Sequence, residues 1–142
     1  MGTPADNVAT LKNAYRQWHT SKGGSLKVWL DLVADDVKIR SLADGAREVE
    51  FTTARNGKEQ FKKYFDGLLA DWEMINYKTN EFIAEGERVA VLGSTAWRNR
   101  RTGREVDTPK ADFWMFRDGK AVEFREFYNT AALIAAARPE AS

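Results

Sequence analysis

The stretch that most constrains the fold is a strand–turn–strand pattern over residues 109–128. Its two runs of alternating apolar and polar residues are separated by an Asp-Gly pair at 118–119, which tolerates the positive φ angles of a tight turn. Because side chains alternate between the two faces of a strand, a core that takes Trp114 and Phe116 also receives Asp112. The pattern therefore predicts a β-hairpin with a carboxylate on its apolar face.

The register of this hairpin decides which acids meet. A three-residue loop with Gly119 in the left-handed conformation would place Asp112 opposite Phe124. Glu126 would then lie diagonal to Asp112 on the same face, about 7–8 Å away. A carboxylate that faces aromatic side chains is costly unless it is paired, protonated or used in chemistry. Asp112 and Glu126 are therefore the first candidates for a functional site.

Three segments before the hairpin have the periodicity of amphipathic helices. The first follows Thr3, the second follows Ser25 and is ended by the acids at 35–36, and the third follows Asn56-Gly57 and carries a broad aromatic face up to Trp72. Residues 37–42 alternate as a strand between the second and third helices. Residues 43–56 are expected to form a polar loop with a short extended piece at 49–51.

From residue 75 onward the sequence has the character of strands, expected at 75–84, 88–98, 104–116 and 121–128, before an alanine-rich helix at 130–137. Helices followed by antiparallel hairpins indicate an α+β fold. We predict a cone: a strongly curved, mostly antiparallel sheet wrapped around three N-terminal helices and enclosing an apolar pocket. Residues 1–142 are expected to form a single domain with a core over about 7–137.

Composition restricts the partners and the chemistry. The 22 basic and 21 acidic residues nearly balance, which argues against nucleic acid and membrane surfaces as partners. Without cysteine, and with His19 as the single histidine, neither a thiolate site nor a polyhistidine metal site is expected. We therefore expect no metal and no cofactor. The absence of a long apolar run or a signal-peptide core predicts a cytoplasmic protein without a membrane span.

The order of elements over residues 7–137 resembles the nuclear-transport-factor-2-like superfamily, especially its SnoaL-like and ketosteroid-isomerase-like branch. Three phrases carry the resemblance, at Ala34-Asp35-Asp36-Val37, at Asn56-Gly57-Lys58-Glu59 and at residues 113–120. The resemblance implies the cone fold, known as a cystatin-like α+β barrel, and a homodimer. It specifies the reaction poorly, because the superfamily holds isomerases, cyclases, dehydratases, epoxide hydrolases and binding modules.

Individual positions can be compared with two enzymes of the superfamily. In ketosteroid isomerase a tyrosine of the first helix and an aspartic acid of the penultimate strand hold the reacting oxygen, and the resemblance places Tyr15 and Asp112 there. The position of that enzyme's base is Ser41. Glu126 is similar to the catalytic aspartate of limonene epoxide hydrolase, whose arginine and second aspartate would fall near Gly93 and Thr95. The resemblance therefore implies parts of two known sites, with neither complete.

We accordingly predict Tyr15, Asp112 and Glu126 as the catalytic residues. In the alternative, Asp112 pairs with Lys110, an arginine or a helix N-terminus, Glu126 forms a salt bridge, and Tyr15 is a core tyrosine. Eight further residues are expected to line the ligand pocket: Trp18, Ser41, Phe61, Phe65, Trp97, Trp114, Phe124 and Tyr128.

Three functions are consistent with these residues. The first is a cofactor-independent isomerase, cyclase, dehydratase or hydrolase that acts on a small hydrophobic carbonyl or hydroxylated ring compound. The second is a small-molecule binding module without turnover, and the third is an interaction scaffold whose cone is filled by its own side chains. The volume of the pocket separates the third from the others. A homodimer is expected through the outer face of the sheet, where Phe113, Met115 and Phe127 lie.

Overall fold

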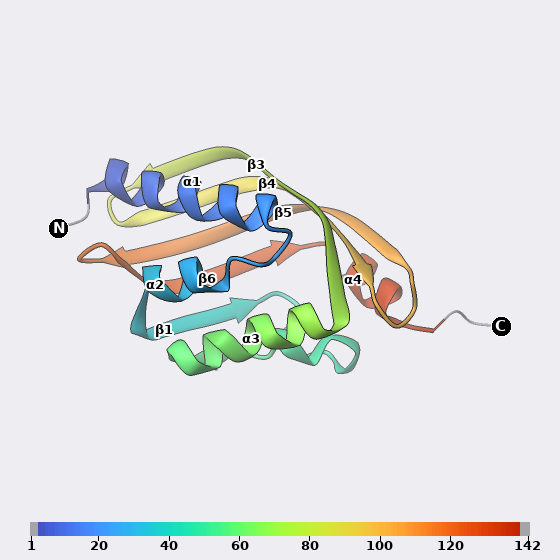
Figure 1. Ribbon diagram of the computed structural model, residues 1–142. Coiled ribbons are helices and arrows are strands. Elements are labelled where there is room, and N and C mark those ends of the chain that lie inside the picture. The colour runs from blue at the N-terminus through green and yellow to red at the C-terminus, as the bar shows by residue number, and fades with distance from the viewer. Residues whose placement is uncertain (1–2, 140–142) are drawn as a thin grey trace.

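The computed structural model describes residues 3–139, which form an α+β cone. The chain runs through the elements in this order: α1 (Pro4–Thr20), α2 (Leu26–Leu32), β1 (Val33–Ser41), the 3-10 helix η1 (Arg47–Thr52), β2 (Arg55–Asn56), α3 (Lys58–Asp71), β3 (Trp72–Glu85), β4 (Arg88–Asn99), β5 (Glu105–Arg117), β6 (Lys120–Tyr128) and α4 (Thr130–Ala137) (Figure 1). None of the helices within residues 3–139 is long and apolar enough to span a bilayer.

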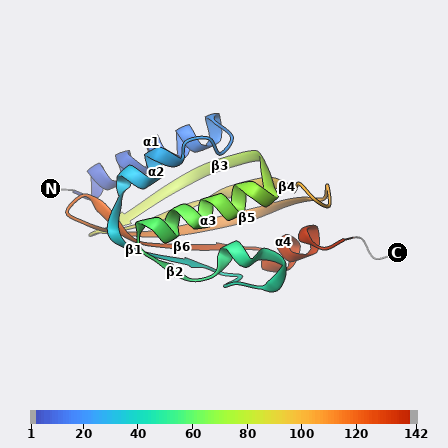
Figure 2. The same cartoon turned by 60° about the horizontal axis from the view of Figure 1, so that its bottom comes forward.

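The six strands form one curved, unclosed sheet in the order β2-β1-β6-β5-β4-β3. All neighbouring strands are antiparallel except β1 and β6, which run parallel. The helices α1, α2 and α3 lie together over one face of this sheet (Figure 2). The predicted fold class is therefore confirmed: the sheet curves around the three N-terminal helices, with the core between them.

The hairpin formed by β5 and β6 has a different register from the predicted one. Asp118 and Gly119 both have positive φ, at 52° and 81°, and Arg117 pairs with Lys120. The turn therefore has two residues, and a bulge after Met115 shifts the rest of the ladder. As a result Asp112 stands directly opposite Glu126, and the predicted pairing of Asp112 with Phe124 is wrong.

Three other boundaries differ from the sequence prediction. The second helix ends at Leu32, so the acids at 35–36 lie in β1. Residues 49–51 belong to η1, in which Val49 alone departs from helical geometry, with φ −138°. Trp72 begins β3 instead of ending α3, although it is 1% exposed as a core residue should be. For Trp72 burial was predicted correctly and the backbone conformation was not, whereas Val49 and Phe51, expected in a polar loop, are buried.

Gly93 in β4 allows the backbones of β3 and β4 to approach closely. The β3–β4 ladder is irregular between Thr79 and Glu81, and Gly93 pairs with Thr79 there. A Cβ atom on Gly93 would stand 1.9 Å from the carbonyl oxygen of Lys78, which is closer than any real contact. The two backbones can therefore approach this closely only because residue 93 has no side chain.

We expect Gly93→Ala to lower the free energy of unfolding by about 3 kcal/mol, because the new methyl group must push the backbone of β3 away. Urea denaturation followed by circular dichroism measures this change. Gly86→Asn is the control: nothing lies within 4 Å of a Cβ there, and asparagine tolerates its φ of +58°. Equal losses in the two variants would show that the close approach at Gly93 has no energetic importance.

Candidate functional site

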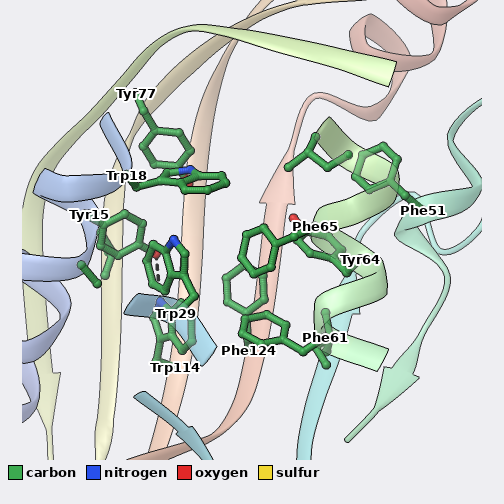
Figure 3. Packing of buried hydrophobic residues seen from close by; sticks show 14 of the residues in the cluster. Tyr15, Trp18, Trp29, Phe51, Phe61, Tyr64, Phe65, Tyr77, Trp114 and Phe124 are labelled. Carbon is green, nitrogen blue, oxygen red and sulfur yellow. Dashed lines mark hydrogen bonds between the residues drawn. The ribbon is translucent and has the colours of Figure 1, made fainter. Parts of the chain in front are cut away.

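An interior cavity lies between the concave face of the sheet and the helices, and its wall is mainly aromatic (Figure 3). Its volume is about 70 Å3, well below the roughly 300–1,000 Å3 of typical ligand sites. The predicted catalytic residues Tyr15, Asp112 and Glu126 all line it. Of the eight predicted pocket residues, Ser41 does not line the cavity. The other seven do: Trp18, Phe61, Phe65, Trp97, Trp114, Phe124 and Tyr128. Their roles in binding stay predictions.

One row across the sheet brings the two acids together. Asp112 on β5 pairs with Glu126 on β6, and Glu126 pairs in turn with Ser41 on the parallel strand β1. All three side chains face the helices, and the residues are 2%, 4% and 6% exposed. The parallel contact between β1 and β6 thus adds a hydroxyl to a pair of buried carboxylates.

Lys110 joins the two carboxylates. It precedes Asp112 by two residues and therefore faces the same side of β5. Its Nζ atom forms an ion pair with Oδ1 of Asp112 and lies 3.1 Å from Oε1 of Glu126. The pairing of Asp112 with Lys110, an alternative to a free functional acid, is therefore present, and it includes Glu126 as well.

The other oxygen of each carboxylate accepts two hydroxyl groups. Oδ2 of Asp112 accepts from Tyr15 at 2.5 Å and from Tyr77 at 3.1 Å. Oε2 of Glu126 accepts from Tyr64 and from Ser41, both at 2.7 Å. Both buried carboxylates are thus held in the same way, with one oxygen on the ammonium group and the other on two hydroxyls.

Two hydrogen-bond chains extend outward from this cluster. The indole N–H of Trp114 donates to the hydroxyl of Tyr15 at 2.9 Å. The hydroxyls of Ser41 and Tyr128 are 2.6 Å apart, and Tyr128 accepts from the backbone N–H of Ala43 at 3.3 Å. Because Ser41 gives its single proton to Glu126, Tyr128 must donate to Ser41. Glu126 is thus connected through two hydroxyls to the half-buried end of β6.

Burial and the neighbouring charges set the ionisation of the cluster. Burial raises the pKa of Asp112, Glu126 raises it further, and Lys110 opposes both effects. Burial alone would lower the pKa of Lys110, but the two carboxylates raise it above its usual value, so the group is an ammonium ion. Burial and the adjacent carboxylates also raise the pKa values of Tyr15, Tyr64 and Tyr77, which therefore remain hydrogen-bond donors.

A groove on the surface between α1 and β3 lies behind two of these tyrosines. Tyr15 and Tyr77 stack with their ring centroids 5.7 Å apart, and both line the cavity and the groove. Lys12 and His19 line the groove only. Nδ1 of His19 accepts the backbone N–H of Tyr77 at 3.3 Å. The tyrosine pair therefore separates the groove from the buried carboxylates.

Sequence reasoning did not assign Lys110, Tyr64 or Tyr77 to the site. The alternation that placed Asp112 inward places Lys110 inward too, so the same signal could have found it. Tyr64 stood on the predicted aromatic face of α3, but nothing in the sequence aimed it at Glu126. Tyr77 faces inward because of the register of β3, which was not predictable from its own residues.

The positions compared with the two enzymes hold other contacts here. Ser41, at the place of the isomerase base, donates to Glu126. Thr95 donates to the carbonyl of Asn76 and accepts from the indole of Trp97. Gly93 has no room for a side chain, so no arginine fits there on this backbone. Within residues 3–139 no three histidine, aspartate or glutamate side chains are grouped as metal ligands; that the protein uses no cofactor stays a prediction.

The comparisons with known proteins place this geometry in a family. A model of the SnoaL-like domain matches residues 14–124. Among solved structures, an NTF2-like protein from Burkholderia xenovorans is 23% identical, with a TM-score of 0.78 and coverage of 97% of this chain and 99% of that one. No curated protein matches the sequence.

Two further solved structures carry functional descriptions. A Jannaschia protein assigned to the SnoaL-like polyketide cyclases is 20% identical, with a TM-score of 0.71 and coverage of 94% of this chain and 93% of that one. A Catenulispora acidiphila protein of ketosteroid isomerase-like fold, in complex with trimethylamine, is 15% identical, with a TM-score of 0.70 and coverage of 88% and 92%. These identities show a shared fold and leave the reaction open.

Removing the ammonium group should unfold the protein more readily than removing the whole cluster. We expect Lys110→Met to cost about 3–5 kcal/mol of unfolding free energy, because two carboxylates then stay buried without a cation. The triple variant Lys110→Met, Asp112→Asn, Glu126→Gln should recover at least half of that loss. Urea denaturation measures both, with the exposed Lys78→Met as control. A triple variant no more stable than Lys110→Met would contradict this reading of the cluster.

The raised pKa of Asp112 also predicts a pH dependence. In the unfolded chain the pKa of Asp112 is near 3.8, so the folded state binds more protons in the interval between 3.8 and its raised folded value. The stability that Asp112 contributes is therefore fully present below pH 3.8 and is lost as the pH rises through that interval. We expect Asp112→Asn to become less destabilising relative to wild type as the pH increases from 4 to 8.

Unfolding free energies measured at several pH values test whether Asp112→Asn becomes less destabilising as the pH rises. Asp107→Asn, on the solvent-facing side of the same strand, controls for the loss of one carboxylate. If the difference between Asp112→Asn and wild type grows with pH, the carboxylate of Asp112 is stabilised rather than disfavoured by its surroundings.

Proposed function

This chain belongs to the SnoaL-like domain family, and we propose that it is a cofactor-independent enzyme that transfers protons on a small hydrophobic carbonyl or hydroxylated ring compound. The observation that carries the proposal is the buried cluster of Lys110, Asp112 and Glu126 on the wall of an aromatic cavity. Ionisable groups with shifted pKa values in such a cavity are typical of acid–base sites. The isomerase, cyclase, dehydratase and hydrolase reactions all remain within this proposal.

The cluster supplies both halves of an enolisation. Glu126 would take a proton from the carbon next to the carbonyl group, and the electron pair of that C–H bond would move onto the carbonyl oxygen. Lys110 and the hydroxyl of Tyr15 are the donors that could stabilise this oxygen as it becomes negative. Returning the proton from Glu126 to another atom of the substrate completes an isomerisation or starts a ring closure.

Buried surroundings make this stabilisation effective. A charge–charge contact in a site without water is several times stronger than the same contact at the surface. The ammonium of Lys110 needs no change of ionisation to serve, because the neighbouring carboxylates raise its pKa. The Catenulispora relative in complex with trimethylamine supports a small ligand for this kind of cone.

The second candidate is a binding module without turnover, and one observation favours it. Every hydroxyl that reaches Asp112 or Glu126 is already engaged, and the cavity of about 70 Å3 would have to widen for a ring compound. A protein that only holds an apolar ligand needs no free base. The two candidates therefore differ in whether Glu126 can leave its hydroxyl partners.

Deuterium incorporation into cyclohexanone in D2O, followed by NMR, tests the enzymatic proposal. We expect the wild type to accelerate exchange of the α protons, and Glu126→Gln to reduce the acceleration by a factor of about 100 or more. Glu123→Gln, on the other face of the same strand, should retain it. Tyr15→Phe should reduce the acceleration by about 100-fold, since one oxyanion donor is removed.

If the wild type does not accelerate the exchange, measurements of cyclohexanone binding separate the remaining possibilities. If cyclohexanone binds and the wild type does not accelerate exchange, the binding module is the better description. If neither exchange nor binding occurs for any enolisable ketone in a screen, the cone is filled by its own side chains and both proposals fail.

We further propose a homodimer through the outer face of the sheet. Phe113 and Phe127 are 44% and 39% exposed, and their rings meet edge to face with centroids 5.5 Å apart. Ile83, which is 56% exposed, stands in the same row of the sheet as Phe113. Exposed apolar groups arranged in this way are typical of an interface.

A cytoplasmic location also remains a prediction.

Sedimentation equilibrium tests the dimer. The wild type should sediment as a dimer and Phe113→Glu as a monomer, because a charge at the centre of an apolar interface has no partner. Arg117→Glu, an exposed change near the end of the same strand, is the control. A wild type that is monomeric at high micromolar concentration would exclude this interface.

A further inference from the structure

One polar atom on the cavity wall has no partner. Trp29, on α2, is 3% exposed and lines the cavity, and its indole Nε1 is buried without a hydrogen-bond acceptor. Within residues 3–139 two other buried side-chain atoms share this condition, Nδ2 of Asn7 and Oγ of Ser25, and neither residue lines the cavity. Of these three fully buried atoms, the donor of Trp29 is therefore the one that belongs to the cavity wall.

Two other tryptophans on the same wall show what a satisfied indole looks like. Trp97 donates to Oγ1 of Thr95 at 2.6 Å, and Trp114 donates to the hydroxyl of Tyr15 at 2.9 Å. Buried polar groups that lack a partner are uncommon, and each costs free energy that a suitable acceptor would return. The fully buried indole N–H of Trp29 thus differs from those of Trp97 and Trp114, which have protein partners.

Water is a poor partner for this donor. Aromatic rings surround Trp29, with centroids 5.0 Å away for Tyr15, 5.5 Å for Trp114 and 6.1 Å for Trp18. A buried water is held by two to four polar groups, and the only acceptor on these three rings is the hydroxyl of Tyr15, which is already engaged with Asp112 and Trp114. An acceptor oxygen attached to an apolar body matches these surroundings better, because its body gains from contact with the same rings.

We propose that the indole N–H of Trp29 binds an acceptor oxygen of the ligand and so orients it in the cavity. The ring of Tyr15 contacts that of Trp29 and its hydroxyl donates to Asp112, so a ligand held by Trp29 would extend toward the cluster. The ligand class is then a compact ring with two oxygens, one at Trp29 and one at Lys110. This inference rests on the proposed function only in requiring that the cavity takes a ligand, with or without turnover.

Since the cavity is small, the rings that cover the indole N–H must shift when a ligand enters. Trp29 is stacked on Trp114 at an interplanar angle of 2°, and the indole N–H of Trp114 donates a hydrogen bond to the hydroxyl of Tyr15. A ligand that reaches Trp29 would therefore move a stack that is connected to the carboxylate of Asp112. A ligand that binds to Trp29 would therefore also shift Trp114 and the hydroxyl of Tyr15.

A matched pair of ring compounds tests the proposal by calorimetry. In 4-methylenecyclohexanone a CH2 group replaces one carbonyl oxygen of 1,4-cyclohexanedione, so the two differ in one acceptor and little in shape. We expect the ratio of their dissociation constants to change about threefold to tenfold in Trp29→Phe, because only the dione loses a hydrogen bond. Leu42→Ala, an exposed change away from the cavity wall, should leave the ratio as in wild type.

The outcomes separate this inference from the proposed function. If both compounds bind and Trp29→Phe weakens them equally, Trp29 is a packing residue, and the proposed function is untouched. If neither compound binds, the inference about Trp29 fails, whereas the proposed function fails only if the screen of enolisable ketones is also negative.

Indole NMR signals give a reading that does not depend on the variant folding. Of the five tryptophan indole N–H protons in wild type, the one with NOEs to the ring of Tyr15 and the stacked Trp114 should move downfield with the dione and not with its analogue. Equal shifts with both compounds would show that this N–H faces only the neighbouring rings.

Discussion

The burial of two carboxylates beside a single ammonium group is the constraint on which the rest of this structure depends. Taking such charges out of water costs several kcal/mol per ion, and their mutual attraction offsets this only when the remaining oxygens are also bonded. Here the compensation comes from hydroxyls on α1, α3, β1 and β3. Each of these elements is therefore fixed against β5 or β6 by a polar contact as well as by packing.

This arrangement puts stability and chemistry in competition. Asp112 and Glu126 are satisfied by the protein itself, so a ligand must offer contacts at least as good as the hydroxyls it displaces. The hydroxyl donors are neutral and can turn toward another acceptor, whereas Lys110 stays close to both acids. The aromatic wall around the carboxylates gives the cavity its shape and a low dielectric constant. The low dielectric constant strengthens the polar contacts of the carboxylates, whether they are made with the hydroxyls or with a ligand.

Local pattern predicted much of the fold and part of the site. Alternation along residues 109–128 placed Asp112 and Trp114 on the inner face, and the periodicity of α3 placed Phe61 and Phe65 in the core, as the structure has them. The register of the hairpin was wrong because the turn has two residues instead of three and because a bulge after Met115 leaves no mark in the sequence. The partners Tyr64 and Tyr77 depend on how distant elements cross, which neither periodicity nor spacing encodes.

The parallel contact between β1 and β6 has a consequence for how the chain folds. The bonds of Glu126 to Ser41 and of Asp112 to Tyr15 join residues that are 85 and 97 positions apart. Closing such long loops before any contact is gained slows folding. During synthesis the N-terminal helices leave the ribosome long before β5 and β6, which carry the acids that accept their hydroxyl groups. The complete cluster can therefore form only after β6 has been synthesised, and a chain that stopped before β6 would have the helices of the cone without Glu126.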